Sequence, residues 1–549
     1  MHHEVLRARL PATRAHPQSP LALLKNTSEK IVLFHIIDRK DRIPSSAKNE
    51  VFLRIDYWND YSFVTMFQVL AFDENGTSHD LESVKIGFKG QTTEESTHSK
   101  LDNQFETLPK GFFSLGVSVE YYNVLGNVVS SQFRDEYLSA IRDIVSSERH
   151  LEAARGEDVF KTSLLRSAKM SSINEQFKRV LEGGAPTTDF DFRFTRPETE
   201  TFAGVDLKFS VKEGSLPSTN IHALIGRNGV GKTTILNDMT EAVVDREKTP
   251  ARFLETGIFN HDRQIRDDFF SSLVSVSFSA FDPFDPPEDR ADPETGVSYF
   301  YVGLKDNKTE KRGRHKELSD LRREILAGLE SCFSESGKKR RWLEAIATLE
   351  SDRNFSEMKL PELSDIPQET KQEATDFRRK TLRRLKKMST GHSIVLLTIT
   401  KLVDSVIEKT LVLIDEPETH LHPPLLSAFT RALSELLHNR NGVAIIATHS
   451  PVVLQEVPKS CVWKVTRSRL SLSSIRPEIE TFGENVGVLT REVFGLEVTK
   501  SGFHTVLEKA VESGDSYDEI LRDFRGRLGF EAKGLLRAMV ANRESIGDE

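Results

Sequence analysis

The chain has 549 residues, of which 38% are hydrophobic and 29% charged, and its formal net charge is −8. This composition predicts a folded globular protein of about three or four structural units. No run approaches the roughly 18 uninterrupted apolar residues of a membrane-spanning helix, and the N-terminal apolar patch is too short for a secretory signal. Two cysteines are too few for a disulfide framework. We therefore expect a cytoplasmic protein with no membrane partner, in which any nucleic-acid site is a local patch.

The expected elements follow one another in clear blocks. Alternating apolar residues and an Asn-Gly turn predict a β-rich unit, and helical spacing predicts a connector after it. A long polar segment with few apolar runs predicts helices inserted into another domain. The expected organisation is a weakly ordered arm over 1–48, broken by the apolar run 31–37, then the β-rich unit over 49–130, the helical connector over 131–187, a first α/β lobe over 188–285, the helical insertion over 286–387, a second α/β lobe over 388–484 and a helical region over 485–549.

The strongest chemical signal is a glycine-rich turn between a short apolar strand at 221–225 and the start of a helix. It matches G-x-x-x-x-G-K-[ST] at every fixed position. In such a loop the backbone N–H groups face phosphates, Lys232 reaches the β- and γ-phosphates, and Thr233 ligates Mg²⁺. An ordinary glycine-rich turn is the alternative, which the strand–turn–helix context disfavours. The predicted nucleotide-binding residues of this phosphate loop are Gly226, Arg227, Asn228, Gly229, Val230, Gly231, Lys232, Thr233 and Thr234.

A second apolar strand, 411–414, ends in Asp415 and Glu416. In a nucleotide site Asp415 would hold Mg²⁺ through water, and Glu416 would polarise the attacking water as a general base. Alone, two acids after an apolar strand are as often a simple strand end, but the phosphate loop favours the functional interpretation. Lys232 and Asp415 are separated by far more residues than one strand–helix–strand crossover needs. The polar helical segment is therefore expected as an insertion between the two halves of the site.

Two further segments carry polar groups at element boundaries. Ser389, Thr390 and Gly391 form an S-T-G turn before an apolar helix, where exposed N–H groups and a hydroxyl would make a second anion-binding terminus. Such a turn alone is more often a simple helix cap. His449 follows the apolar strand 443–447, and alone it would be taken for a capping or core histidine.

The order of these motifs resembles the ATPase heads of the ABC superfamily. The phosphate loop, the helical arm, the S-T-G turn, the string D-E-P-E-T-H-L-H-P that starts at Asp415, and T-H-S-P around His449 are similar to its soluble branch of RecF-like, SMC-like and OLD-type AAA family ATPases. The resemblance covers about residues 190–480. It implies an α/β fold of the P-loop NTPase, ABC-ATPase type, with an N-terminal β-rich unit and an inserted helical arm.

The same resemblance implies a mechanism. ATP and Mg²⁺ would be the cofactors, and Glu416 and His449 would be catalytic, His449 as the switch that senses the γ-phosphate. Ser389, Thr390 and Gly391 would contact the γ-phosphate of ATP that a second copy of the chain holds, which makes the protein a homodimer or higher oligomer. One position departs from the pattern, because ABC heads usually carry a glutamine where Ser279 stands here. A serine can still bind Mg²⁺ or its water, so the predicted metal ligands are Thr233, Asp415 and Ser279.

The expected partner follows from weaker resemblances. OLD-type proteins carry a nuclease domain after the head, and residues 450–549 show no strand ending in the acids that such a domain needs. The N-terminal β-rich unit is similar to that of standalone ATPases paired with an HNH nuclease in Septu-type antiphage systems, including those attached to retrons. This resemblance implies a separate HNH-type nuclease subunit and a role in antiphage defence.

The alternative hypothesis is a RecF- or SMC-like protein that binds DNA in repair or recombination. Its motivation is a run of seven basic residues between Arg378 and Lys387, which could equally be a solvated helix face. This alternative makes nucleic acid a partner and predicts ATP-dependent duplex binding that weakens steeply with salt.

Overall fold

The computed structural model describes residues 32–57, 63–166, 168, 170–184, 187–200, 203–255, 262–267, 269–279, 283–290, 297–308, 314–368, 370–438, 440–468, 471–495 and 502–547. Within these residues the strands form three sheets, of six, four and seven strands. The six-stranded sheet belongs to the N-terminal unit, and the other two belong to the head that carries the phosphate loop.

The N-terminal sheet has the strand order β5-β1-β2-β3-β4-β6. Strand β1 pairs parallel with β2, and the other neighbours are antiparallel. The sheet begins at Leu33, inside the segment predicted as an arm, so the predicted boundary at residue 48 is too late. The apolar run pairs as a strand because its Phe34 side chain is fully buried. The strands are β1 (Leu33–Ile37), β2 (Glu50–Ile55), β3 (Met66–Phe72), β4 (Ser78–Phe88), β5 (Gln104–Phe105) and β6 (Phe112–Gly116).

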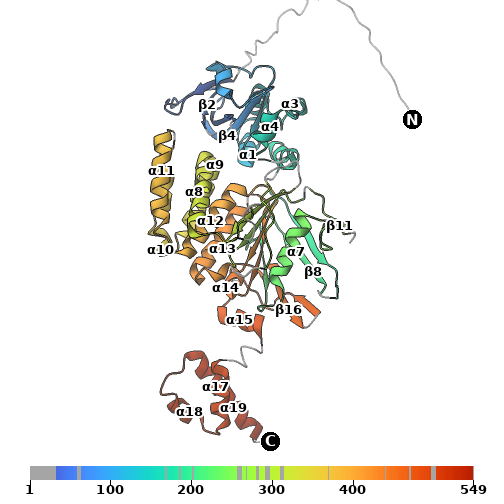
Figure 1. The fold of residues 1–549 in the computed structure, drawn as a ribbon, viewed down its shortest axis with the longest axis vertical. Helices are drawn as coiled ribbons and strands as arrows, with labels where there is room; N and C mark the ends of the chain where they lie inside the picture. The colour runs from blue at the N-terminus through green and yellow to red at the C-terminus, as the bar shows by residue number, and fades with distance from the viewer. Residues whose placement is uncertain are drawn as a thin grey trace, which may run out of the picture. The chain divides into compact units, whose positions relative to one another are not determined.

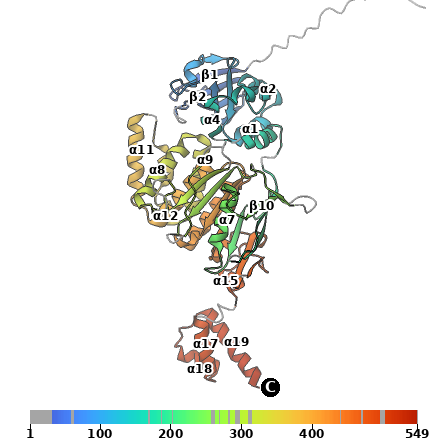
Figure 2. The ribbon, with the colours of Figure 1, turned by 45° about the vertical axis from the view of Figure 1, so that its right-hand side comes forward.

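Short helices pack beside this sheet and share one hydrophobic core with it; Figure 2 shows α1, α2 and α4 around strands β1 and β2. Helices α1 and α2 each start after a serine, Ser118 or Ser130, whose hydroxyl accepts a hydrogen bond from a backbone N–H of the first turn. The elements are η1 (Thr97–Lys100), α1 (Val119–Asn127), α2 (Ser131–Ala140), α3 (Glu148–Ala154), α4 (Asp158–Thr162), η2 (Leu164–Arg166), α5 (Met170–Ser172), η3 (Ile173–Phe177) and α6 (Lys178–Leu181).

The central sheet of the head has the order β13-β12-β14-β15-β9-β16-β17. Its neighbours run parallel except β16 and β17. Strand β13 lies inside the segment 286–387, which was predicted as a helical insertion; the first part of that segment instead contributes β13, the edge strand of the sheet. The strands are β9 (Ile221–Ile225), β12 (Ser272–Ser277), β13 (Ser298–Gly303), β14 (Thr410–Asp415), β15 (Val443–Thr448), β16 (Val462–Ser468) and β17 (Ser471–Ile475).

Helices cover both faces of the central sheet, which is why β14 and β15 are buried at every position. Alternate residues face opposite layers: Leu411 and Leu413 join the core of α7, whereas Val412 and Ile414 join the core of α12 and α13. Figure 1 shows α7 on one side of the sheet and α12 and α13 on the other. The bounds are α7 (Lys232–Val244), α12 (Thr390–Ser405) and α13 (Pro423–His438).

The four-stranded sheet, ordered β11-β10-β7-β8, lies in the same core as α7. Its strands are β7 (Phe190–Arg196), β8 (Val205–Val211), β10 (Arg252–Glu255) and β11 (Arg263–Gln264). Aromatic residues of alternating positions on β7 and β8 stack across the strands, with ring centroids of Phe192 and Phe209 5.0 Å apart.

The helical insertion packs against the head. Trp342 is fully buried, and its indole N–H donates to Thr400 of α12 at 3.0 Å. The insertion shares one hydrophobic core with α12 and α13. Its elements are α8 (Leu318–Ser334), α9 (Ser336–Leu349), α10 (Arg353–Ser356), η6 (Leu360–Asp365) and α11 (Lys371–Leu385).

The remaining elements complete the head and form a small C-terminal bundle with its own core of Leu507, Val511, Ile520, Leu536 and Val540. Across the part of the chain that the structure describes, no helix combines the length and apolar character needed to span a bilayer. The elements are η7 (Pro417–Thr419), α14 (Pro451–Leu454), η8 (Lys459–Cys461), α15 (Val486–Phe494), α17 (Phe503–Glu512), α18 (Tyr517–Asp523) and α19 (Phe530–Gly547). The predicted α/β P-loop fold, with its β-rich unit and helical insertion, is confirmed.

Candidate nucleotide-binding site

The phosphate loop leads from the end of β9 into the first residue of α7, as the sequence predicts. Gly229 and Gly231 have φ values of +81° and +99°, which residues with a side chain rarely adopt. At Gly226 an added Cβ would lie only 2.2 Å from the carbonyl oxygen of Val465. The loop can therefore wind tightly enough to direct its N–H groups at an anion only because these positions are glycines.

Lys232 is held inside the loop. Its Nζ donates to the carbonyl oxygens of Gly226 and Arg227 at 3.0 and 3.1 Å, and it lies 3.8 Å from Oε1 of Glu416. Burial is the main cause that lowers the pKa of Lys232, and the carboxylates of Glu416, Asp415 and Glu418 oppose it. The loop thus places a buried cation beside the acids at the end of β14.

Thr233 and Asp415 come together across the sheet edge. The Thr233 hydroxyl donates to Oδ2 of Asp415 at 2.8 Å, and the Asp415 side chain is buried. A hydroxyl and a carboxylate are the hard oxygen ligands that Mg²⁺ prefers, so the pair fits the predicted cation. Bound there, Mg²⁺ would neutralise negative charge on the phosphate chain.

Serines near this pair lie on β12. In the parallel register Ser277 lies opposite Asp415, and Ser275 and Ser277 line a small cavity together with Thr233 and Asp415. Ser279, the predicted metal ligand, follows the end of the strand by two residues and does not line that cavity. Alternation alone would put Ser275, Ser277 and Ser279 on one face, and the end of the strand at Ser277, opposite Asp415, is what separates Ser279 from the other two.

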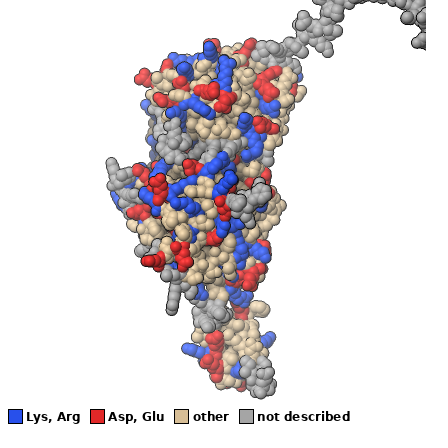
Figure 3. Space-filling view, turned by 90° about the vertical axis from the view of Figure 1, so that its right-hand side faces the viewer, with Lys and Arg blue, Asp and Glu red and all other residues tan. Residues whose placement is uncertain are grey.

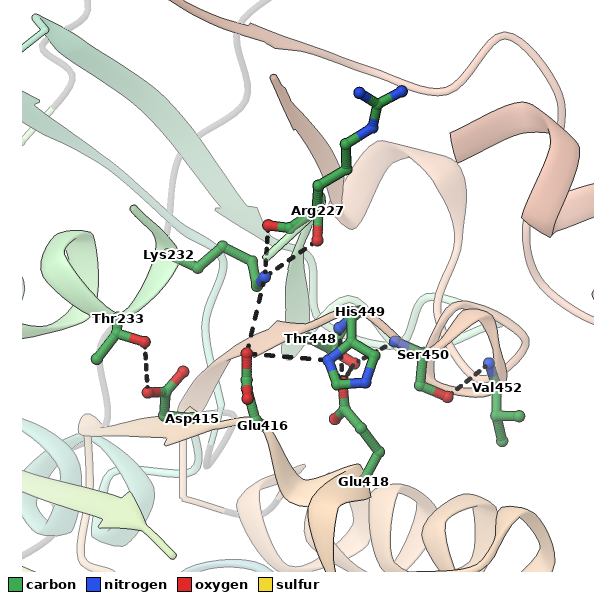
Figure 4. Close-up of polar contacts among 11 residues, drawn as sticks. Arg227, Lys232, Thr233, Asp415, Glu416, Glu418, Thr448, His449, Ser450 and Val452 are labelled. Atoms are coloured by element: carbon green, nitrogen blue, oxygen red, sulfur yellow. Dashed lines mark hydrogen bonds and ion pairs between the residues drawn. The ribbon is translucent and has the colours of Figure 1, made fainter. Parts of the chain in front are cut away.

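Glu416 and His449 follow two neighbouring parallel strands, β14 and β15. Glu416 has a left-handed backbone, with φ of +44°, which turns its side chain from the strand direction. Its Oε1 lies 3.8 Å from Nζ of Lys232 and 3.8 Å from Nδ1 of His449. Figure 4 shows Glu416 between Lys232 and His449, with Thr233 and Asp415 to one side. One chain therefore assembles the phosphate loop, both acids and the histidine.

The S-T-G turn caps helix α12 and is exposed. Oγ of Ser389 accepts from the backbone N–H of His392 at 3.3 Å and lies 2.6 Å from Nδ1 of the same histidine. At Gly391 an added Cβ would lie 2.5 Å from the carbonyl oxygen of His420, so the turn fits closely against the string that follows β14. In the described part of the chain, the Ser389 contacts stay within this turn and do not reach the phosphate loop.

Asp352, which sequence reasoning missed, stands behind the S-T-G turn. Its carboxylate lies 3.5 Å from Nε2 of His392 and 3.0 Å from Nε2 of His422, and it also caps α10 by accepting from the Phe355 N–H at 2.8 Å. A polar chain therefore runs from Ser389 through His392 to Asp352 and on to His422. Asp352 belongs to the insertion, and nothing in its sequence spacing points to the two histidines.

The basic run lies on α11 and the turn after it. Three of its arginines pair with acids: Arg378 with Glu330 at 2.6 Å, Arg379 with Asp376 at 2.8 Å and Arg384 with Glu362 at 2.8 Å. The other four basic side chains are exposed, namely Lys380, Arg383, Lys386 and Lys387. Figure 3 draws the side of the molecule away from α11, and on that side basic and acidic residues are intermixed. Ion pairing thus neutralises part of the charge on which the DNA-binding alternative depends.

Comparisons with known proteins find a matching family model and a related sequence. Residues 258–455 match the family described as "AAA domain, putative AbiEii toxin, Type IV TA system", a match that begins after the phosphate loop. The chain is 51% identical over 522 residues to protein ea59 of Escherichia phage lambda, which covers 93% of this chain and 98% of that protein.

Three similar solved structures have 12–15% sequence identity to this chain. The ADP conformation of an ATP-binding cassette from an ABC transporter is 14% identical, with a TM-score of 0.29, and the match covers 57% of this chain and 98% of that chain. An SMC head bound to the C-winged helix domain of ScpA is 12% identical, with a TM-score of 0.27, and the match covers 53% of this chain and 97% of that chain. UvrA2 from Deinococcus radiodurans is 15% identical, with a TM-score of 0.29, and the match covers 58% of this chain and 42% of that chain. Similarity at this level carries no conclusion about what the chain binds.

Proposed function

The chain belongs to the family of protein ea59 of Escherichia phage lambda, and we propose that it is an ATP-binding and ATP-hydrolysing switch that pairs head to head. One observation carries this proposal. A single chain brings together the phosphate loop, Asp415, Glu416 and His449, whereas its S-T-G turn is exposed and has no contact with them in the described residues. A second copy can supply that turn to the first.

The residues divide the chemistry between them. Lys232 and the loop N–H groups bind the phosphates, and Thr233 and Asp415 hold Mg²⁺. Glu416 accepts a proton from the attacking water, and His449 contacts the γ-phosphate. Ser389 of the other copy donates to the same phosphate. ATP binding therefore adds association energy between two copies, and loss of the γ-phosphate removes it.

Complementation between two inactive variants tests the shared site. Lys232→Ala removes the phosphate contact, and Ser389→Arg blocks the S-T-G turn, so each variant alone should lack hydrolysis. When the two are co-expressed, half of randomly paired dimers combine the two chains and hold one intact site of two, so about a quarter of the wild-type rate should return.

A matched control uses Lys232→Ala with Glu416→Gln. These two residues lie 3.8 Å apart in one chain, so the mixed dimer has no intact site and should stay inactive. Equal recovery in both mixtures, or no recovery in either, would contradict the shared site. So would a monomer that hydrolyses ATP at full rate irrespective of dilution.

The finer step of the proposal is control of a separate HNH-type nuclease in antiphage defence. It is supported by the resemblance of the N-terminal unit alone, and neither the relative's name nor the family description mentions a nuclease. Co-purification of a nuclease subunit whose activity changes with ATP would support this step. ATP-dependent duplex binding that falls steeply with salt, without such a subunit, would instead favour the DNA-binding alternative.

A further inference from the structure

Glu418 is a third acid of the string after β14, and its contacts all concern the segment of His449. Its Oε1 accepts from the backbone N–H of His449 at 2.6 Å and from the Thr448 hydroxyl at 2.7 Å, and it lies 3.1 Å from Nδ1 of the His449 ring. Figure 4 shows this carboxylate below the imidazole, with Glu416 on the other side. Glu418 therefore joins the loop after β14 to the loop after β15.

Burial shows which of the two partners is the anchor. The Glu418 side chain is 8% exposed, whereas the His449 ring is 42% exposed. A half-exposed ring on a strand end is not fixed by packing, so its direction depends on its polar contacts. Nδ1 of the ring lies 3.1 Å from Oε1 of Glu418 and has no hydrogen-bond partner among the described residues, so the carboxylate orients the imidazole through its charge and proximity.

Burying the negative charge of Glu418 at this site costs free energy. It adds a buried negative group beside Asp415 and Glu416, where a polyphosphate is expected, and burying a carboxylate requires strong compensating donors. A neutral acceptor such as Gln could also close the loop through the backbone N–H and the hydroxyl. The negative charge also acts on Lys232 at longer range, but the ionisable group it meets at 3.1 Å is the His449 ring.

We propose that Glu418 is the positioning residue of His449, which orients the ring toward the γ-phosphate and ties its movement to Glu416. Both acids flank Pro417 at the start of η7, so a shift of His449 on loss of the phosphate is passed through Glu418 to the turn that carries the general base. This inference rests on the proposed function, because it assumes that His449 senses the nucleotide.

Glu418→Gln tests the charge while it keeps an acceptor for the loop. We expect ATP binding within about twofold of wild type and a fall in kcat of about tenfold, a loss of the kind seen when a positioning contact is removed. The informative readout is coupling: if Glu418 acts through His449, adding Glu418→Gln to His449→Ala should slow hydrolysis no further. Glu418→Ala should behave in the same way with a larger fall in kcat.

The matched control is Glu480→Gln. Glu480 also accepts from backbone N–H groups, those of Lys459 and Thr481 at 2.8 and 2.9 Å, but it has no contact with His449 in the described residues. The Glu480→Gln variant should have the kcat and KM of the wild type. Wild-type kcat in Glu418→Gln, or additive losses in the double variant, would overturn the positioning role while hydrolysis by the wild-type protein stands. A wild-type protein that fails to hydrolyse ATP would overturn the proposed function, and the role of Glu418 with it.

Discussion

The two halves of the proposed pocket are built in different ways. In the phosphate-loop half, each group contacts its neighbours within one chain, and Lys232 and Asp415 are buried. In the S-T-G half, Ser389 is exposed and is supported from behind by His392 and Asp352. The first half is organised within a single chain. In the second half the exposed serine caps its own helix, and the insertion contributes Asp352 behind it.

The largest effect should come from the phosphate-loop half. Lys232→Ala removes the cation that faces the phosphates, and we expect nucleotide affinity to fall by about 100-fold or more. Glu416→Gln should instead retain ATP, lose hydrolysis and stabilise the paired state. Binding of a fluorescent ATP analogue and sedimentation with ATP and Mg²⁺ measure both effects.

Lys212→Ala provides the control for this comparison, because Lys212 is a half-exposed lysine that pairs with Asp189 at 3.4 Å, outside the phosphate loop. The Lys212→Ala variant should bind ATP with the same affinity as the wild type. If Glu416→Gln hydrolysed ATP at the normal rate, the assignment of the general base would be wrong, and the first half would not be the catalytic one.

A smaller effect on ATP hydrolysis should come from changing Asp352, which lies behind the S-T-G turn. Asp352→Asn keeps an oxygen that can cap α10 but removes the negative charge beside His392 and His422. We expect nucleotide binding by the phosphate loop to be unchanged and kcat to fall by about fivefold to tenfold, because Ser389 is less well oriented. Steady-state kinetics with a separate binding measurement distinguish the two effects.

Asp320→Asn makes the same chemical change at the start of α8 in the same insertion, where Asp320 pairs with Arg323 and is remote in sequence from both histidines. It should leave kcat unaltered. A loss of ATP binding in Asp352→Asn, with kcat preserved, would show that the two halves are not separable as described.

The sequence predicted where the phosphate loop and the two acids lie in the fold, because the evidence for their positions is local. A glycine pattern, a lysine and two acids each follow an apolar strand directly, and parallel strands bring such ends together. The S-T-G half depends on pairings between distant segments. Asp352 meets His392 only after the insertion packs, the parallel register selects Ser277 rather than Ser279 to face Asp415, and β13 becomes a strand only by pairing with β12.

The smallest effect on ATP hydrolysis should come from a change to a contact that lies outside both halves of the proposed pocket. Glu120 of the N-terminal unit pairs with Arg440 at 3.0 Å, and Arg440 precedes β15, at the end of the strand opposite to His449. Burial alone would raise the pKa of Glu120, but Arg440 and Arg341 outweigh it and lower the pKa to about 2. The ionised carboxylate therefore stabilises the folded state fully above its unfolded pKa of about 4.5, and this contribution is lost as the pH falls toward 2.

Glu120→Gln should accordingly lower the free energy of unfolding by about 1–3 kcal/mol at neutral pH, and the difference from wild type should shrink as the pH falls below about 4.5. Thermal unfolding followed at several pH values measures this difference. Glu148→Gln, which breaks an exposed pair with Arg155, should change little at any pH. Because the Glu120 contact lies away from both halves of the pocket, kcat at neutral pH should stay at the wild-type value; a fall in kcat would mean that the N-terminal unit takes part in the hydrolytic cycle.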